Sequence, residues 1–388
     1  MNGFEFRIPT RLIFGPGSLA KLPQVVIGLG SKALIVTGTS PRRTGTLPKV
    51  LTLLDQVGIT SVVFEKVTSN PLASTIRAGV ELAQAEQCDF VIGIGGGSPI
   101  DAAKAIAMCA VNPGDITDYQ PGGSLVDQTP EKSLPVIAIA TTAGTGTEIN
   151  RYLVITNDQT REKPGIGFEC NYPVVGIVDP ELMLSVPPEI TADTGIDVLY
   201  HAMEAYVSKG ANRFSDLIAM EAIQLVVANL ETVLADGSNL EARSNMAWAS
   251  TLAGLAIDIA GTVTIHAAAH PISGHFNKPH GQTLAAISVA YLRNNYMANP
   301  IKFAGLAELL GSQANKLNTT ELAAQSPVAL QNFLRRVGRD ITLSSLGVTE
   351  DYIDQLVADT FKTMAGALGN NPQPVTPADV AQIYRESL

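Results

Sequence analysis

The sequence is short of cysteine, of charge and of long apolar runs, and each shortage excludes a class of protein. Its three cysteines, Cys88, Cys109 and Cys170, have no CxxC spacing, so neither a disulfide framework nor a thiolate metal site is indicated. Lys and Arg number 26 against 36 Asp and Glu, without a basic cluster, which argues against nucleic acid or an anionic membrane as a partner. Residues 246–257 are the most apolar later stretch, but Asp258 ends it short of a membrane span, and the first residues lack the pattern of a secretory signal. We therefore expect a soluble, cytoplasmic protein.

Short apolar runs alternate with amphipathic segments in the first half of the chain. The 388 residues suggest two domains at about 150 residues per domain, and the hydrophobic content of 46% is enough for two cores. The β-branched runs are typical of parallel strands and the intervening segments have helical periodicity, which together predict a doubly wound α/β domain. The expected strands are residues 33–37, 61–64, 89–94 and 135–141, and the expected helices are 47–57, 72–87 and 99–108.

The second half has fewer glycines and prolines and longer segments rich in Ala, Leu and Met, which predict an all-helical domain. We expect the boundary near residues 180–188, where Asp179-Pro180 and Pro187-Pro188 interrupt helix formation. The predicted domains are therefore residues 1–184 and 185–388. The expected helices of the second domain include residues 194–207, 214–234, 240–260 and 327–337.

A glycine loop follows the third predicted strand. Gly95-Gly-Gly-Ser98 stands between that strand and a helix with Pro99 at its first position. Glycines let the backbone approach a ligand, and the free N–H groups and dipole of a helix start favour an anion. The strand-loop-helix context favours a phosphate site, although tight turns also need glycine and the loop is not a GxGxxG motif at the first strand. A second polar loop, residues 141–148, offers hydroxyls that suit a dinucleotide, the alternative being a Thr-rich surface loop.

Four of the five histidines of the chain lie within one short segment, at His266, His270, His275 and His280. The fifth, His201, follows Asp197 by four residues, so the carboxylate and the imidazole project from one helix face. His266 and His270 repeat this spacing. Two such helix pairs facing each other predict a divalent metal site with imidazole nitrogens, one carboxylate and an open position for substrate. The spacing leaves open which three histidines bind the metal and which one carries a proton.

A dinucleotide loop and an Asp/His metal site in two halves of one chain resemble the iron-containing (group III) alcohol dehydrogenase family. The resemblance covers nearly the whole chain and rests on residues 8–15, 95–101, 141–148, 179–182, 194–204 and 266–281. It implies a dehydroquinate synthase-like fold, with an N-terminal dinucleotide-binding domain and a C-terminal helical metal-binding domain. It also implies hydride transfer between NAD(P)(H) and a primary alcohol or aldehyde, with the metal activating the alcohol oxygen.

The resemblance also assigns residues to roles. The implied metal ligands are Asp197, His201, His266 and His280, with Fe²⁺ as the expected ion and Zn²⁺ as an alternative. His270 matches the histidine beside the nicotinamide, and it is the expected proton carrier. The implied cofactor contacts are Gly38, Thr39, Ser40, Asn70, Gly96, Gly97, Ser98, Asp101, Thr141, Thr142, Thr145, Thr147, Lys163 and Leu182.

The loop after the first predicted strand departs from the commonest family pattern. Gly38 stands where NAD-preferring relatives have an aspartate that binds the ribose 2′-hydroxyl. Without that carboxylate, the hydroxyls of Thr39 and Ser40 and the charge of Arg42 or Arg43 are able to bind a 2′-phosphate. The loop resembles those of NADPH-dependent aldehyde reductases and butanol dehydrogenases, so NADP(H) is expected over NAD(H), the alternative being that the arginines are simply solvated.

Several alternatives remain at this point. A glycerol or diol dehydrogenase of the same fold, a dehydroquinate synthase, or a non-catalytic nucleotide- and metal-binding protein would share parts of the pattern. Departures at Asp258, Ile259 and His275 leave the substrate open, and the candidate pocket positions are Asn150, Tyr152, Leu153, Asp258 and His275. An N-terminal β segment and a large apolar helical half predict a homodimer or a larger homo-oligomer.

Overall fold

The computed structural model describes residues 3–314 and 316–388, which form two compact units. One unit is Arg7–Val186, and the other contains Pro187–Leu388 together with the described residues up to Phe6. The sequence assigned all residues before 185 to the first domain. The initial segment joins the helical unit instead because Phe6 packs on Phe214 of that unit, with ring centroids 4.6 Å apart.

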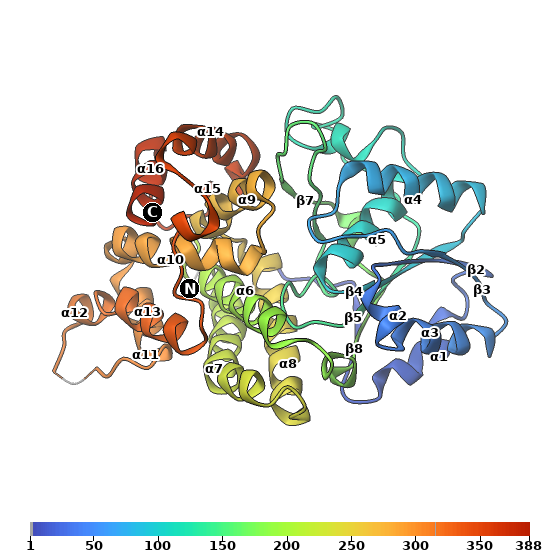
Figure 1. Cartoon of the computed structure of the whole chain (residues 1–388), viewed down its shortest axis with the longest axis horizontal. Helices are drawn as coiled ribbons and strands as arrows, with labels where there is room; N and C mark the ends of the chain where they lie inside the picture. Colours follow the sequence, from blue (N-terminus) through green and yellow to red (C-terminus); the bar gives the residue numbers. More distant parts are fainter. Residues whose placement is uncertain (1–2, 315) are drawn as a thin grey trace. The chain divides into compact units, whose positions relative to one another are not determined.

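A six-stranded parallel sheet forms the centre of the first unit (Figure 1). Its strand order is β1-β8-β5-β4-β2-β3, and every neighbouring pair is parallel. The carboxyl ends of β2, β4 and β5 therefore lie side by side, and the chain order reverses between β2 and β4, which is where open α/β sheets bind ligands. The strands are β1 Arg11–Phe14, β2 Lys32–Thr37, β3 Thr60–Phe64, β4 Phe90–Gly95, β5 Val136–Ala140 and β8 Val175–Val178.

Helices cover both faces of this sheet, as the doubly wound prediction requires (Figure 1). Alternate residues of β2 point to opposite cores, because Leu34 and Val36 pack in the cluster beneath α4 and α5 while Ala33 and Ile35 pack with α1 and α3. The helices of this unit are α1 Leu22–Val26, α2 Ser40–Arg43, α3 Thr46–Asp55, α4 Ala73–Ala85 and α5 Gly97–Cys109. All four predicted strands and all three predicted helices are present, within two residues at each end.

Four short strands were not predicted. β1 and β8 have four residues each, and the antiparallel pair of β6 (Tyr152–Val154) and β7 (Gly165–Gly167) has three residues in each strand. Runs this short contain too few alternating residues to give a periodic signal. Two of the three residues of β7 are also glycines, which are depleted in strands.

The second unit contains only helices in its described residues, as predicted. No helix runs through Pro187, which is extended, but the helix expected over residues 194–207 begins six residues earlier, at Pro188. Proline is well tolerated at the first helical position, where its missing N–H would have no partner within the helix. The helices are α6 Pro188–Val207, α7 Arg213–Ala235, α8 Leu240–Ala260, α9 Thr264–Phe276, α10 His280–Asn295, α11 Pro300–Leu309, α12 Thr319–Ala323, α13 Ser326–Arg336, α14 Ile353–Thr363, α15 Ala365–Gly369 and α16 Pro377–Glu386.

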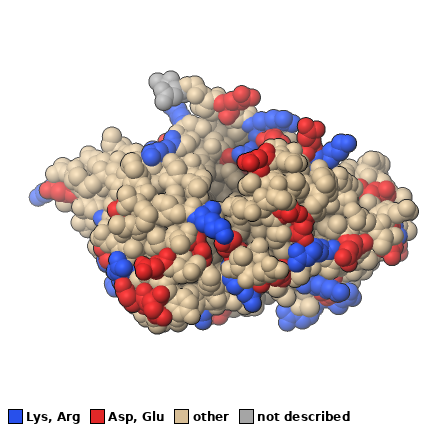
Figure 2. Space-filling model, turned by 90° about the horizontal axis from the view of Figure 1, so that it is seen from above, with Lys and Arg blue, Asp and Glu red and all other residues tan. Residues whose placement is uncertain are grey.

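By length and composition alone, α7 is the one described single helix that is apolar enough to cross a membrane, and α8 with α9 passes only as a span bent by 108°. The core helices of globular proteins pass the same test. In this unit the buried stripe of α7, with Ala222, Val226 and Leu230, belongs to a helix that contacts α6 and α8. On the face shown in Figure 2, acidic and basic side chains are interspersed and separated by uncharged surface.

Candidate functional site

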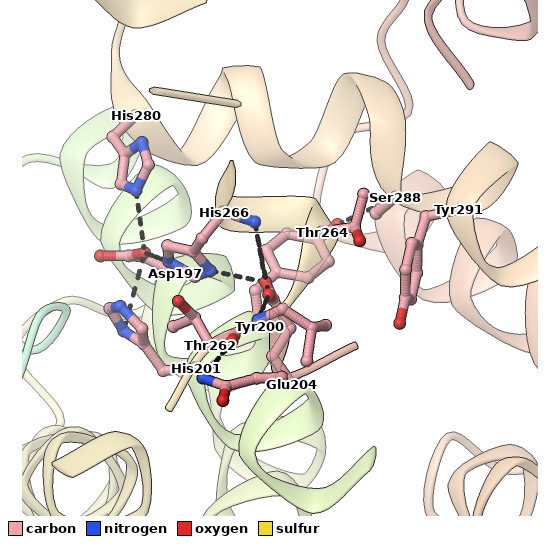
Figure 3. A network of polar contacts seen from close by, with 12 residues as sticks. Asp197, Tyr200, His201, Glu204, Thr262, Thr264, His266, His280, Ser288 and Tyr291 are labelled. Carbon is pink, nitrogen blue, oxygen red and sulfur yellow. Dashed lines mark hydrogen bonds and ion pairs between the residues drawn. The ribbon is translucent and has the colours of Figure 1, made fainter. Parts of the chain in front are cut away.

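Three helices of the second unit bring a carboxylate and three imidazoles together. Asp197 and His201 lie on α6, His266 lies in the first turn of α9, and His280 is the first residue of α10. Figure 3 shows the three rings around one oxygen of Asp197. That oxygen, Oδ1, lies 3.7 Å from His201 Nδ1, 3.6 Å from His266 Nε2 and 3.9 Å from His280 Nε2. The pairing of Asp197 with His201 at four residues, predicted from the sequence, is thus present on one helix face.

These separations suit a shared metal ion better than direct hydrogen bonds. Each is longer than 3.5 Å, whereas ligand atoms held about 2.1 Å from a tetrahedral ion lie about 3.4 Å from one another. The ligand atoms of Asp197, His201 and His266 all lie within 4.8 Å of one another, and all three residues are buried. His266 Nε2 is buried and has no hydrogen-bond partner among the described residues. A buried lone pair aimed at a carboxylate in this way fits a divalent cation.

Glu204 contacts the nitrogen of His266 that faces away from Asp197. The sequence analysis assigned Glu204 no role. Its side chain is completely buried and its Oε1 lies 2.5 Å from His266 Nδ1. The same carboxylate accepts hydrogen bonds from the backbone N–H groups of Val263 and His266. Donation of the Nδ1 proton to Glu204 leaves Nε2 as the lone pair that faces Asp197, the arrangement usual for metal-binding histidines. The available signal was spacing, because Glu204 lies seven residues after Asp197 and three after His201, on the same face of α6.

The charge around His266 makes its imidazole unusually basic in the metal-free protein. Burial lowers the pKa of His266, but the nearby Glu204 and Asp197 carboxylates more than reverse this and raise the pKa to about 9. The two acids thus stabilise positive charge at this position, whether the charge is carried by a proton or by a metal ion.

In the first unit, the glycine loop forms a cradle at the carboxyl end of β4. Gly95 has φ +153°, Gly96 precedes α5, and α5 begins at Gly97 without a side-chain N-cap. A Cβ at Gly96 would lie 2.7 Å from Thr142 Oγ1, and one at Gly97 would lie 2.6 Å from Thr145 Cγ2. The polar loop therefore packs directly on the glycines. The open helix start and the close backbone approach fit a phosphate group.

A buried network fixes the polar loop that covers this cradle. The Thr147 hydroxyl donates to Asp101 Oδ1 at 2.7 Å and accepts from Lys104 Nζ at 2.6 Å. Asp101 Oδ2 accepts from the N–H of Val154 in β6. Burial raises the pKa of Asp101 to about 6, against the opposing effects of Lys104, Thr147, Val154 and Lys163. Asp101 and Thr147, which are predicted cofactor contacts, therefore also hold the polar loop in place. The sequence analysis did not single out Lys104, the third member of this network.

The other predicted contacts occupy the same unit. Gly38 follows β2, and Thr39, Ser40 and Arg43 are exposed. Asn70 has a left-handed backbone with φ 51°, and Thr141 bonds through its N–H to the Gly95 carbonyl at 2.8 Å. Ser98 lies in the first turn of α5. The two remaining residues, Lys163 and Leu182, are buried, and Leu182 lies in a short 3₁₀ helix.

Comparisons with known proteins agree with the features found in each of the two units. A sequence model described as iron-containing alcohol dehydrogenase matches residues 9–180, and one described as the C-terminal part of the Fe-containing alcohol dehydrogenase family matches residues 191–388. The chain belongs to the iron-containing alcohol dehydrogenase family. This membership confirms the family and the fold class predicted from the sequence. An iron-containing alcohol dehydrogenase catalyses metal-dependent oxidation of alcohols with a divalent metal and a nicotinamide cofactor, and this chain is one.

Curated relatives and solved structures of the family match over the whole length. The 1,3-propanediol dehydrogenase of Citrobacter freundii is 38% identical, with 99% of each chain covered. The NAD-dependent methanol dehydrogenase of Bacillus methanolicus is 35% identical, with 99% of this chain and 100% of that protein covered. An archaeal halo-thermophilic alcohol dehydrogenase from a Red Sea brine pool superposes with a TM-score of 0.95 at 36% identity, with 100% of this chain and 99% of that chain covered. The aligned regions therefore cover both units of this alcohol dehydrogenase.

Two further histidines of this alcohol dehydrogenase, His270 and His275, lie on α9. The His270 ring is buried, with its centroid 5.1 Å from that of His280 and 6.2 Å from that of His266. His275 points elsewhere, because its Nε2 lies 2.6 Å from Asp359 Oδ2 on α14. Spacing alone had left all four clustered histidines as candidates, and this geometry separates His275 from the other three.

The candidate pocket positions differ in what they contact. Leu153 is completely buried in the hydrophobic core on the α5 face of the sheet, so it is a packing residue. Asn150 is also buried, and its side chain bonds to the backbone of Gly146 and Tyr152, which shapes the polar loop. Asp258 lies on α8 with 9% of its surface exposed.

Closing the cradle should impair cofactor binding alone. Gly97→Ala places a methyl group against Thr145 and should raise the cofactor KM by about ten- to a hundredfold, because small displacements of binding groups are costly. Steady-state kinetics at varied cofactor concentration will measure the change. Metal content should stay at the wild-type level. The double variant with Thr145→Ser, which removes the obstructing Cγ2, should recover part of the loss, and a normal KM in the single variant would contradict the cradle.

Proposed function

We propose that this enzyme is an Fe²⁺-dependent aldehyde reductase and primary alcohol dehydrogenase that prefers NADP(H), with Asp197, His201, His266 and His280 as the metal ligands. The observation that carries the proposal is the convergence of three imidazoles on one buried carboxylate oxygen, at 3.6–3.9 Å. Relatives named for 1,3-propanediol, methanol and butanol support a primary alcohol or diol as the substrate class.

The ligand set determines what charge the site presents. When bound there, the divalent ion acts as a Lewis acid toward the oxygen of the substrate. Asp197 is the single anionic ligand, so the site keeps about one net positive charge. Glu204 orients His266 and increases its basicity, and the burial of Asp197 and His266 excludes water from that side of the site. His270, which is buried with its ring beside that of His280, is the proposed proton carrier between substrate and solvent.

The nicotinamide cofactor, which supplies or accepts the hydride, is proposed to bind in the first unit. Gly96, Gly97 and Ser98 would hold its pyrophosphate at the start of α5, and Thr141, Thr142 and Thr145 would bind it from the polar loop. Asp101 and Thr147 would keep that loop in place through their mutual hydrogen bond. The remaining proposed contacts are Gly38, Thr39, Ser40, Asn70, Lys163 and Leu182.

The proposed preference for NADP(H) rests on the end of β2. A Cβ at Gly38 would lie 2.8 Å from the Val67 carbonyl oxygen, so an aspartate would not fit there without moving the backbone. Arg42 is paired with Glu65 at 2.7 Å, which leaves exposed Arg43 as the better partner for a 2′-phosphate. The methanol dehydrogenase relative is named as NAD-dependent and the butanol dehydrogenase structure as NADH-dependent, so kinetics must decide this point.

The test is the ratio of kcat/KM for NADPH and NADH with butanal, measured on metal-stripped protein before and after anaerobic addition of Fe²⁺ or Zn²⁺. We expect metal-dependent turnover with a higher kcat/KM for NADPH. Arg43→Ala should lower the NADPH value by about tenfold and leave the NADH value unchanged, because it removes one charge-assisted hydrogen bond. Lys49→Ala, an exposed lysine on α3, is the matched control. A wild-type preference for NADH would refute the proposed preference for NADP(H). Oxidation of 1,3-propanediol, assayed in parallel, distinguishes a diol dehydrogenase from a dehydrogenase of simple primary alcohols.

The proposal includes a cytoplasmic homodimer or larger homo-oligomer, as the sequence predicts. Zn²⁺ is the alternative ion, because nitrogen and oxygen ligands suit both metals.

A further inference from the structure

An ion-pair network lies beside the proposed metal ligands, and its Arg339–Asp193 pair is buried while Glu189 is exposed. Arg339, which follows α13, has a side chain that is only 9% exposed. Its Nε donates to Asp193 Oδ1 at 2.6 Å, and its Nη2 donates to the carboxylate of Glu189 at 2.7 Å and to the Glu189 carbonyl at 2.9 Å. Buried ion pairs are a weak source of stability, because desolvation opposes the attraction between the charges. The position of the network suggests another role.

Asp193 links this arginine to α10. It lies on α6, one turn before Asp197, and its second oxygen accepts a hydrogen bond from Gln282 Nε2 at 3.1 Å. Between His280 and Gln282 stands Gly281, where a Cβ would lie 2.1 Å from the carbonyl oxygen of Asp193. The first turn of α10 therefore rests directly on the backbone of α6. Burial raises the pKa of Asp193, and the Arg339 guanidinium opposes this rise by stabilising the carboxylate.

The placement of His280 depends on the first turn of α10, and its side chain is less enclosed than those of the other proposed ligands. It is the first residue of α10, and its N-cap, Pro279, offers no side-chain hydrogen bond. Its side chain is 22% exposed, against 4–8% for Asp197, His201 and His266. Side-chain hydrogen bonds join this turn to neighbouring helices: Thr283 Oγ1 bonds to Ser273 Oγ of α9 at 3.0 Å, and Gln282 bonds to Asp193 of α6.

We propose that Arg339 is a positioning residue that acts through Asp193 and Gln282 to hold His280 at the metal site. This inference rests on the ligand set given under the proposed function. Arg339 and Gln282 have no ligand role in it, so their effect on the metal must pass through the placement of α6 and α10, which Asp193 and Gln282 join. Outer-sphere partners of metal ligands typically change metal affinity by about 10- to 100-fold.

The variants Gln282→Ala and Arg339→Lys test this chain of contacts. Lysine keeps the charge beside Asp193 but lacks the planar fork that also reaches Glu189. Arg243→Lys is the matched control, since Arg243 is a buried arginine of the same unit that bonds to Thr191 and to the Gly237 carbonyl. For each full-length protein, the readouts are the Zn²⁺ Kd in a competing chelator, the visible absorption of the Co²⁺-substituted protein and the thermal midpoint without metal.

We expect Gln282→Ala and Arg339→Lys to weaken Zn²⁺ binding by about 10- to 100-fold, with the lysine variant nearer to wild type, and to change the Co²⁺ spectrum in the same direction as His280→Ala. Arg243→Lys should lower the thermal midpoint and leave the spectrum unchanged. If His280→Ala alters neither Kd nor spectrum, the ligand set is wrong and this inference falls with it. If His280→Ala alters both while Gln282→Ala and Arg339→Lys behave like Arg243→Lys, the ligand set stands and the positioning role is refuted.

Discussion

Replacing His266 with alanine is expected to abolish metal binding and turnover together. Its Nε2 is a buried nitrogen that has no hydrogen-bond partner in the described part of the chain and lies 3.6 Å from Asp197 Oδ1. The change therefore removes one ligand and leaves Asp197 and Glu204 with less compensation for their charges. Loss of Lewis-acid activation is worth several kcal/mol, so kcat should fall by about 10³-fold or more. Metal analysis of the purified variant and aldehyde reduction with added Fe²⁺ or Zn²⁺ are the measurements.

His275→Ala is the matched control for this experiment. It removes a histidine from the same helix whose ring nitrogen pairs with Asp359, so it should keep the wild-type metal content. A His266→Ala protein that retains both metal and full activity would contradict the assignment of the site. Loss of metal in both variants would instead show that α9 as a whole tolerates no change. His201→Ala on α6 would then test the ligand set, because loss of metal in that variant supports the site and retention contradicts it.

The longer elements of the fold could be predicted because each carries a local signal. Residues 33–37 alternate between two apolar faces and are observed as β2, and residues 240–260 form an uninterrupted helix as expected. The sequence could not show that Phe6 packs on Phe214, because this pairing depends on tertiary contact. The start of α6 was missed for a local reason: a proline at the first helical position resembles a helix breaker when it is read from sequence alone.

The site was predictable where its residues repeat at helical spacing. Asp197 and His201 are one helical turn apart. The chain has only five histidines, so chance would rarely place four of them within residues 266–280. Helical spacing places Glu204 on the same face as Asp197 and His201, but it gives no signal for contacts with distant elements. Glu204 meets His266 across 62 residues, and Asp193 meets Arg339 across 146 residues. Acidic residues and arginines are common on helix surfaces, so only the folded chain distinguishes these from solvated ones.

The second large effect concerns the proton that competes with the metal at His266. In the metal-free protein Glu204 and Asp197 overcome the effect of burial and raise the pKa of His266 to about 9, so a proton must leave before the nitrogen can bind an ion. The apparent affinity for Zn²⁺ or Mn²⁺ should therefore rise by about tenfold per pH unit between pH 7 and 9 and then level off. Because this folded pKa is above the unfolded value, the proton stabilises the metal-free protein fully below about pH 6.5, and this stability is lost as the pH rises through about 9.

Glu204→Gln keeps the size of the side chain and removes the charge that helps to raise this pKa. In the variant, the affinity should level off at a lower pH than in the wild type. Above pH 9, where the proton no longer competes, the variant should bind metal about 10- to 100-fold more weakly, because His266 loses its carboxylate partner. Metal titrations in a competing chelator from pH 6 to 9.5 will show both changes. Glu221→Gln, an exposed acid on α7, is the control for charge alone and should follow the wild-type curve. Identical pH profiles for Glu204→Gln and the wild type would show that Glu204 does not hold the proton on His266.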